Sequence, residues 1–160
     1  MVKHVGLIGL PVAHSVSPAF QQVAFDYCGV DVQYEFWETS SEDLQERVSA
    51  LRGSGILGAQ VTVPHKESVV RLVDDPVGDV TLLGACNVVG NRDGRLTAHN
   101  TDLTGFLRAL KGDAGFKPKG KRALVLGAGG AARAIVLALA REGIGSLVIS
   151  NRTPRRADSL

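Results

Sequence analysis

The first part of the chain alternates between strand spacing and helix spacing. The apolar runs at 5–8 and 57–63 have the length of buried strands, and residues 33–37 alternate as a half-buried strand does. Helical patterns lie between these runs, so the order is strand, helix, strand, helix, strand. This order is typical of a parallel sheet covered by helices, and it predicts an α/β fold.

Start and stop signals place the helices. Ser17-Pro18 predicts a first helix with Pro18 at its first position, and Gly29 ends it. One face of this helix carries Ala19, Val23, Ala24 and Tyr27. The segment 40–43 resembles a capping box for a second helix, and a third, short helix is predicted over Lys66 to Val73.

A turn-rich stretch, 84–100, follows the third helix. Two apolar runs flank an Asp-Gly pair at 93–94 there, which predicts a β-hairpin. A helix is expected from Asp102, and a strand at 122–126 then begins a new α/β unit. We therefore divide the chain into a first domain, 1–102, and the start of a second domain, 103–160.

Composition excludes several classes of protein. The chain has 160 residues, of which 44% are hydrophobic and 21% charged, so it is neither collagen-like nor disordered. No apolar run approaches the ~20 residues of a membrane helix, and we expect no membrane association and no signal peptide. Cys28 and Cys86 match no metal or redox spacing, so we expect no metal site and reduced thiols in the cytoplasm.

The net charge of +2 combines two unlike parts. Residues 1–102 carry 7 lysines and arginines against 13 acidic residues, a balance of −6. Residues 103–160 carry 11 against 3, a balance of +8. A basic second part favours contact with phosphates, although a merely solvated face is the simpler alternative. Nucleic acid is a poor partner because the second part has only Phe106 and Phe116 as aromatic residues for stacking on bases.

A glycine-rich loop at 127–132 follows the strand 122–126 and opens a helix. Its order, G-x-G-x-x-A, is a variant of the dinucleotide-binding fingerprint. The residues that we expect to hold a pyrophosphate at the helix start are Gly127, Ala128, Gly129, Gly130 and Ala131. A purely structural glycine turn is the alternative, but the surrounding strands and helix favour nucleotide binding.

The next strand indicates which nucleotide binds. An NAD-binding unit usually carries an acidic residue roughly 20 residues after the glycines, where it bonds the ribose 2′-hydroxyl. Here the strand ends in Asn151-Arg152-Thr153 and is followed by Arg156, without an acidic residue. Arg152 and Arg156 suit a 2′-phosphate, which predicts NADP, and an exposed basic turn is the alternative.

Four polar motifs in the first domain suit a polyhydroxylated acid. They are Ser15-Val16-Ser17-Pro18, Thr62-Val63-Pro64-His65-Lys66, Gly84-Ala85-Cys86-Asn87 and Asn100-Thr101-Asp102. Simpler explanations exist, since Ser17 and Asp102 are also suitable helix caps and Asn87 a turn residue. Lys66 is harder to explain structurally, because the helix dipole disfavours a cation at the start of the expected helix.

Together with the glycine loop, these motifs closely resemble the shikimate dehydrogenase family from Gly6 to Leu160. The family reduces 3-dehydroshikimate to shikimate with NADPH, in aromatic amino acid biosynthesis. The resemblance implies an N-terminal open βαβ substrate-binding domain followed by a partial Rossmann NADP-binding domain. It also implies that Lys66 supplies a proton to the carbonyl oxygen and that Asp102 orients the same hydroxyl.

The resemblance implies further site residues. Those expected at the substrate are Ser15 and Ser17 for the carboxylate, with Gln60, Thr62 and Asn87 at the ring hydroxyls. Those expected near the adenosine phosphate are Asn151, Arg152, Thr153 and Arg156. No metal is implied, and the oligomeric state stays open, a homodimer being one option.

The chain departs from the family pattern in three respects. Gln60 stands where the family usually has Asn, and Val88 where it commonly has Thr. A quinate/shikimate dehydrogenase with shifted preference is therefore an alternative, as is a non-catalytic ligand-binding relative. Family members are also much longer, so we expect a C-terminally shortened chain that binds substrate weakly and turns over poorly by itself.

Overall fold

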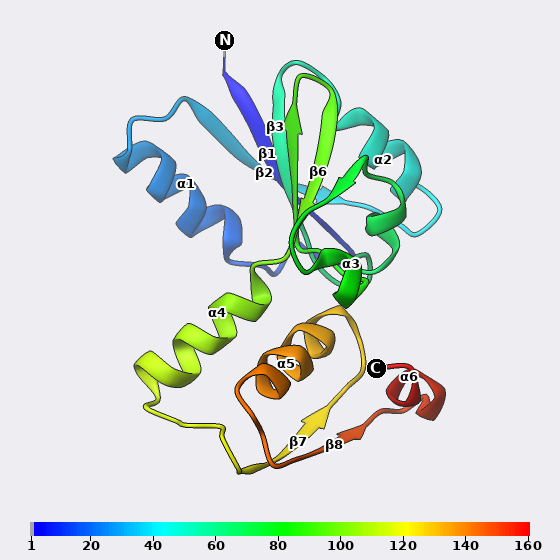
Figure 1. The fold of residues 1–160 in the computed structure, drawn as a ribbon. Coiled ribbons are helices and arrows are strands. Elements are labelled where there is room, and N and C mark those ends of the chain that lie inside the picture. Colours follow the sequence, from blue (N-terminus) through cyan, green and yellow to red (C-terminus); the bar gives the residue numbers. More distant parts are fainter. Residues whose placement is uncertain (1) are drawn as a thin grey trace.

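The computed structural model describes residues 2–160, which form two β-sheets connected through helix α4 (Figure 1). The strands of the larger sheet are β1 (Lys3–Gly9), β2 (Val32–Glu38), β3 (Ile56–Val61), β4 (Asp75–Pro76), β5 (Val88–Arg92) and β6 (Arg95–His99). The smaller sheet pairs β7 (Arg122–Leu126) with β8 (Ser146–Ser150). The α-helices are α1 (Ser17–Tyr27), α2 (Leu44–Ala50), α3 (Val80–Leu83), α4 (Asp102–Arg108), α5 (Gly130–Arg141) and α6 (Pro154–Asp158). A 3₁₀ helix, η1 (Ser68–Arg71), and a π-helical turn, η2 (Ala109–Asp113), complete the set.

The larger sheet has the strand order β2-β1-β3-β5-β6-β4. Its first three strands are parallel, as the alternating strand and helix pattern predicts. Strand β5 runs antiparallel to β3, so the sheet as a whole is mixed rather than parallel. The predicted α/β class is confirmed.

The predicted hairpin is formed by β5 and β6, which pair from Val88 with His99 to Arg92 with Arg95. Asp93 and Gly94 at its tip have φ angles of 53° and 84°. A two-residue type I′ turn requires positive φ at both central positions, which is the reason that Asp-Gly is favoured there.

Two layers of helix cover the larger sheet. On one face, α2 and η1 enclose the main core, in which Ile8, Leu51, Val69 and Leu96 are fully buried. On the other face, α1 covers a smaller cluster of Leu7, Val12 and Tyr34 with the partly buried Val5 and Phe25. Adjacent residues of β1 therefore belong to different cores, as the alternation of a strand requires.

The residues that share one face of α1 are exposed. Val23 and Tyr27 are 66% and 92% exposed, Ala19 and Ala24 are exposed as well, and no residue of α1 is fully buried. The helix instead turns Gln22 toward edge strand β2, whose outer backbone groups have no neighbouring strand. The Gln22 amide donates to Val32 O (3.0 Å) and accepts from Tyr34 N (2.8 Å), which satisfies two of these groups.

Helices α3, α4 and α5 join the two sheets. Leu83 of α3, Leu103 of α4, and Ala134 and Ala138 of α5 form one buried cluster. At its border, Arg141 makes a bidentate ion pair with Asp79, with both distances 2.6 Å. Figure 1 shows α5 between α3 and strand β7. The glycine-rich start of α5 lies against Lys66 and Ala85, in the part of the chain that contains the larger sheet.

Candidate functional site

Lys66 and Asp102, which are 36 residues apart in the chain, form an ion pair beside the end of β3. Lys66 Nζ donates to Asp102 Oδ2 over 2.6 Å, and the two side chains are 15% and 25% exposed. Asn87 Nδ2 donates to the other carboxylate oxygen, Oδ1, over 3.0 Å and to Thr101 Oγ1 over 2.8 Å. Three of the predicted site residues therefore form one partly buried polar cluster.

Backbone contacts hold this cluster in place. The carbonyl oxygen of Lys66 accepts from Cys86 N (2.8 Å), which joins the segment after β3 to the segment before β5. Asn100 Oδ1 accepts from Asp102 N (3.0 Å), and Asn100 Nδ2 donates to Ala85 O (3.0 Å). Asn100 thus positions the start of α4, a role that its place in a predicted motif did not specify.

The predicted helix over residues 66–73 is wrong. Only the four-residue 3₁₀ helix η1 forms, over Ser68–Arg71, and Lys66 precedes it. Val69 and Val70 are β-branched, which lowers helix propensity, and Val69 is fully buried in the main core. The helix-dipole argument for Lys66 therefore fails, and its contact with Asp102 takes the place of that argument.

Cys86 lies beside the Lys66–Asp102 pair and is fully buried. Burial raises the pKa of its thiol to about 12, while the charges of Lys66 and Asp102 act on it in opposite directions. The thiol is therefore neutral near pH 7, which does not suit a nucleophile or a metal ligand.

Ser15, Ser17 and Thr62 line one groove of about 520 Å³ at the ends of β1 and β3. Ser15 Oγ donates to Ser17 Oγ over 3.1 Å and accepts from Ser17 N over 3.2 Å. Ser17 does not cap α1, because it is the first residue of the helix and Val16 is the N-cap residue. The N–H of Ser17 is bound by the Ser15 hydroxyl instead. The simpler capping explanation for Ser17 is thus wrong.

The two other structural alternatives, for Asp102 and Asn87, also fail. Asp102 is the first residue of α4 rather than its cap, and the N-cap residue Thr101 makes no side-chain capping bond. Asn87 is more than a turn residue, because its side chain contacts both Thr101 and Asp102.

Gln60 lies apart from these residues in a second groove, of about 240 Å³, between α1 and the sheet. Its Oε1 accepts from Tyr34 Oη over 2.5 Å, and burial raises the pKa of Tyr34 to about 12, so that hydroxyl keeps its proton. Gln60 pairs with Val88 across β3 and β5. The two residues that depart from the family pattern are therefore neighbours.

The glycine loop leaves open space at Gly127 and Gly129. Gly127, at the end of β7, has a φ of 114°, which disfavours any other residue, and a Cβ at Gly127 or Gly129 would meet no atom within 4 Å. The first turn of α5 carries no acidic residue, and Ala132 is buried against the strand side. The loop is thus open where a pyrophosphate would approach the N-terminus of α5.

The basic turn after β8 is also suited to a phosphate. Asn151 Nδ2 donates to Thr153 O over 2.9 Å, which shapes the turn before α6. Within residues 2–160, Arg152 is exposed and takes part in no hydrogen bond or ion pair, whereas Arg156 binds Glu67. The turn itself contains no carboxylate, so the residues present fit an adenosine 2′-phosphate.

Glu67 is a residue that sequence reasoning missed. It follows Lys66 directly, yet its two partners, Arg133 and Arg156, lie in the other half of the chain. No local pattern around Glu67 indicates this contact, because the partners are far away in the sequence.

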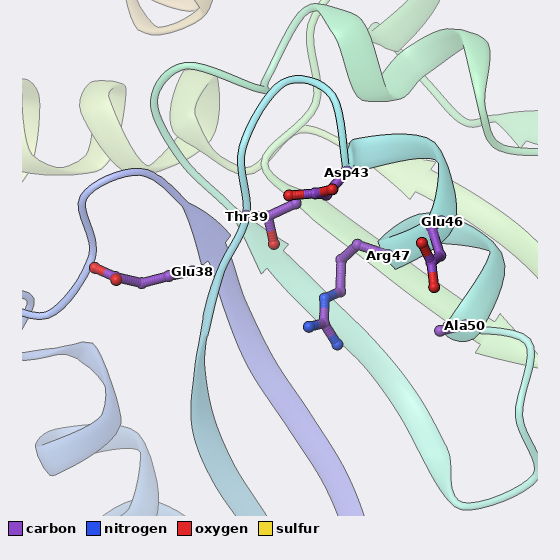
Figure 2. Close-up of a pocket in the computed structure, with 6 residues that line it drawn as sticks. All are labelled: Glu38, Thr39, Asp43, Glu46, Arg47 and Ala50. Carbon is purple, nitrogen blue, oxygen red and sulfur yellow. The ribbon is translucent and has the colours of Figure 1, made fainter.

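A further pocket, of about 280 Å³, lies between the end of β2 and α2. Figure 2 shows its lining, with Glu38 on the opposite side from Glu46 and Ala50. The remaining lining residues are Thr39, Asp43 and Arg47. None of the predicted site residues lines this pocket, and the Arg47 guanidinium lies over the ring of Trp37, 5.6 Å from its centroid.

Residues 2–160 contain neither a membrane-spanning helix nor a cluster of metal-binding side chains. No helix in that range is long and apolar enough to cross a membrane. Likewise, the side chains described contain no group of three or more His, Cys, Asp or Glu residues that could hold a metal ion.

Comparison with known proteins extends over both parts of the chain. Residues 7–89 match the family described as shikimate dehydrogenase substrate binding domain, and residues 111–160 match shikimate / quinate 5-dehydrogenase. The shikimate dehydrogenase (NADP(+)) of Moorella thermoacetica is 48% identical over 158 residues, which is 98% of this chain and 52% of that protein.

Solved structures agree with this assignment. Shikimate dehydrogenase from Aquifex aeolicus has a TM-score of 0.90 and 37% identity, with 99% of this chain and 59% of that chain covered. Shikimate 5-dehydrogenase from Thermus thermophilus, solved with NADP(H) and shikimate, has a TM-score of 0.88 and 40% identity over 99% and 59%. The chain spans about half the length of the curated relatives that it matches. The match over residues 7–89 covers more than half of the chain, which belongs to the shikimate dehydrogenase family.

Proposed function

We propose that the chain provides the substrate site and the first part of the cofactor site of an NADP-dependent shikimate dehydrogenase. The reaction interconverts 3-dehydroshikimate and shikimate, a step toward chorismate and the aromatic amino acids. The observation that carries the proposal is the 2.6 Å contact between Lys66 and Asp102, beside the open N-terminus of α5. The similar enzyme from Thermus thermophilus was solved with NADP(H) and shikimate, which supports the same ligands here.

In this proposal the chain divides at the start of α4. Residues 1–102 form the substrate-binding and catalytic domain, and residues 103–160 begin the Rossmann domain that binds NADP. Helix α4 starts at Asp102, so the catalytic carboxylate stands at the border between the two parts.

Lys66 and Asp102 carry the proton chemistry. Lys66 Nζ gives a proton to the carbonyl oxygen of 3-dehydroshikimate, and Asp102 accepts a hydrogen bond from the hydroxyl group that forms. When bound, NADPH supplies the hydride. Asn87 donates to Asp102 Oδ1 and so keeps the carboxylate oriented toward Lys66. A purely ligand-binding relative needs no such proton donor.

Polar residues of the two grooves, together with Asn87 of the Lys66–Asp102 cluster, orient the substrate. Ser15 and Ser17 bind its carboxylate with their hydroxyl groups, which already lie 3.1 Å from each other. Thr62 and Asn87 bind ring hydroxyls. Gln60 takes part through its Nε2 amide, because its Oε1 already accepts from Tyr34 Oη.

The cofactor residues act through backbone and charge. The N–H groups of the loop at the start of α5 bind the pyrophosphate, and they belong to Gly127, Ala128, Gly129, Gly130 and Ala131. Around the adenosine phosphate we place Asn151, Arg152, Thr153 and Arg156. A guanidinium group and a phosphate form charge-assisted hydrogen bonds, which favour NADP over NAD.

We also propose a cytoplasmic protein that acts on a small molecule rather than on nucleic acid. Free Cys28 and free Cys86 are compatible with a reducing compartment. Phe106 packs into the junction between the two parts, so Phe116 is the exposed aromatic residue of the second part. One exposed ring makes a poor platform for stacking bases. Whether the protein forms a homodimer is tested by analytical ultracentrifugation, which measures its mass in solution.

The test is reduction of NADP with shikimate, followed by the absorbance of NADPH, in the wild type and Lys66→Ala. Loss of the proton donor is expected to lower kcat by about 10²- to 10⁴-fold. Lys111→Ala is the matched control. Lys111 lies away from the site, where its Nζ donates to Glu142 Oε2 at a distance of 2.9 Å, so this substitution should leave kcat unchanged. Quinate assayed in parallel gives the substrate preference.

Calorimetric titration with shikimate accompanies the assay and measures binding without turnover. A Lys66→Ala protein as fast as the wild type would remove Lys66 from the mechanism. Wild-type protein that binds neither shikimate nor NADP would contradict the proposed function itself.

A further inference from the structure

Glu67 lies between two guanidinium groups that come from the other half of the chain. Its Oε1 accepts from Arg156 Nη2, and its Oε2 lies 3.4 Å from Arg133 Nε. The side chains of Glu67, Arg133 and Arg156 are 30%, 22% and 51% exposed. One carboxylate therefore faces two cations, which leaves one positive charge uncompensated.

The two arginines are held to different degrees. Arg133 extends from α5, its Nη1 donates to Leu83 O over 3.3 Å, and its Nε is buried without a hydrogen bond in the described structure. The 3.4 Å contact with Glu67 is close enough for an ion pair but is poorly directed, so it compensates the charge without satisfying the N–H. Arg156 is half exposed and lies on the short helix α6, where it is free to exchange partners.

This contact lies next to the catalytic pair. Glu67 follows Lys66, and the start of α5 packs against the Lys66 side chain, since a Cβ at Gly130 would lie 2.7 Å from Lys66 Cβ. A change at Glu67 therefore occurs one residue from the proposed proton donor and beside the N-terminus that receives the nucleotide.

We propose that Glu67 controls cofactor preference, by holding Arg156 in the nucleotide-free protein and releasing it to the 2′-phosphate of NADP. This inference rests on the proposed function, because it needs the nucleotide at the start of α5. A phosphate monoester carries about −1.5 to −2 charges, whereas the carboxylate carries −1. The electrostatic attraction of Arg156 to the phosphate is therefore stronger than its attraction to Glu67. Glu67 keeps Arg133 as its partner and is not left unpaired. NAD has no such phosphate and leaves the contact intact.

The test is Glu67→Gln, with the dissociation constants of NADP and NAD measured by titration calorimetry. Glutamine keeps the length of the side chain and an oxygen for the guanidinium groups, but it removes the competing charge. An exposed ion pair contributes modestly, so NADP is expected to bind about two- to fivefold more tightly, while NAD binding stays unchanged.

Two further proteins complete the experiment. In an Arg156→Ala background, Glu67→Gln should no longer change NADP affinity, because the competition needs both residues. Asp79→Asn is the matched control: it breaks the other ion pair between the two halves, Asp79 with Arg141, and should leave the ratio of NADP to NAD affinity unchanged.

The outcomes separate the inference from the proposed function. Weaker NADP binding by Glu67→Gln would mean that Glu67 orients Arg156 for the phosphate, and an equal gain for NAD would mean that it only joins the two halves. An unchanged ratio of the two affinities would equally overturn the inference. Wild-type protein that binds neither nucleotide would instead overturn the proposed function.

Discussion

Gly130 and Gly129 are neighbours in the glycine loop, but replacing Gly130 with alanine should lower the stability of the protein, whereas replacing Gly129 should not. A Cβ at Gly130 would lie 2.7 Å from Lys66 Cβ and 3.4 Å from Ala85 Cβ. The optimal separation of two carbon atoms is about 3.5–4.0 Å, so the first contact is about 1 Å too short. Lys66 Cβ is attached to the backbone, and no change of rotamer moves it away.

The cost of Gly130→Ala follows from these distances. Forcing an extra carbon into a packed contact destabilises a protein by about 1–3 kcal/mol, and replacing a helical glycine returns up to about 1 kcal/mol. We therefore expect the free energy of unfolding to fall by roughly 1–2 kcal/mol. The strain also acts on Lys66, so its 2.6 Å contact with Asp102 should lengthen.

Gly129→Ala is the matched control. Gly129 has extended backbone angles, φ −95° and ψ −173°, and a Cβ there would meet no atom within 4 Å. Its stability should stay within about 1 kcal/mol of the wild type, the gain coming from the less flexible unfolded chain. The new methyl group occupies the space in front of the helix, so nucleotide binding should weaken instead.

Urea unfolding of the three proteins, followed by circular dichroism and by the fluorescence of Trp37, measures the difference. Trp37 is the only tryptophan and is 8% exposed, so it reports on the larger sheet. A Gly130→Ala protein as stable as Gly129→Ala would refute the packing of α5 against Lys66.

Three other predictions concern separate parts of the chain. Exposed Cys28 should react with a thiol reagent in the native protein at pH 8, whereas Cys86, with its pKa raised to about 12 by burial, should react only in denaturant; a count of two native thiols would contradict its burial. Hydrogen bonds from Arg52 and the backbone lower the pKa of Asp74 to about 2 from 3.8, so the stabilisation present above pH 4 is lost as the pH falls toward 2. Asp74→Asn should flatten this dependence of the urea midpoint, and an identical acid profile would exclude the contact. Arg152→Asp should weaken NADP binding at least about tenfold in calorimetry and leave NAD binding little changed, because it removes a charge-assisted contact and adds a repulsive one; equal NADP affinity would remove Arg152 from the phosphate site.

Much of the fold was predictable because its signals are local. The Asp93-Gly94 turn needs positive φ at both residues, and Gly127 needs it at the end of β7, so the side chains themselves indicate the backbone. The glycine loop likewise predicts a strand before it and a helix after it. These requirements hold wherever in space the elements come to lie.

Other predictions failed because packing overrides propensity. The apolar spacing of α1 does not mark a buried face, since edge strand β2 needs a polar partner and Gln22 supplies it. The pattern after β3 resembled an α-helix. However, Val69 is buried in the main core, and only the 3₁₀ helix over Ser68–Arg71 forms.

The candidate site divides in the same way. The sequence by itself determined which residue types are available, among them a lysine after a strand, an aspartate opening a helix and arginines without an acidic neighbour. Only the tertiary structure decided that Lys66 contacts Asp102, that Gln60 contacts Tyr34, and that Glu67 lies between Arg133 and Arg156. The physical reason is separation along the chain: Glu67 and Arg156 are 89 residues apart, and no local pattern specifies a contact that exists only once α5 has packed against α3 and α4.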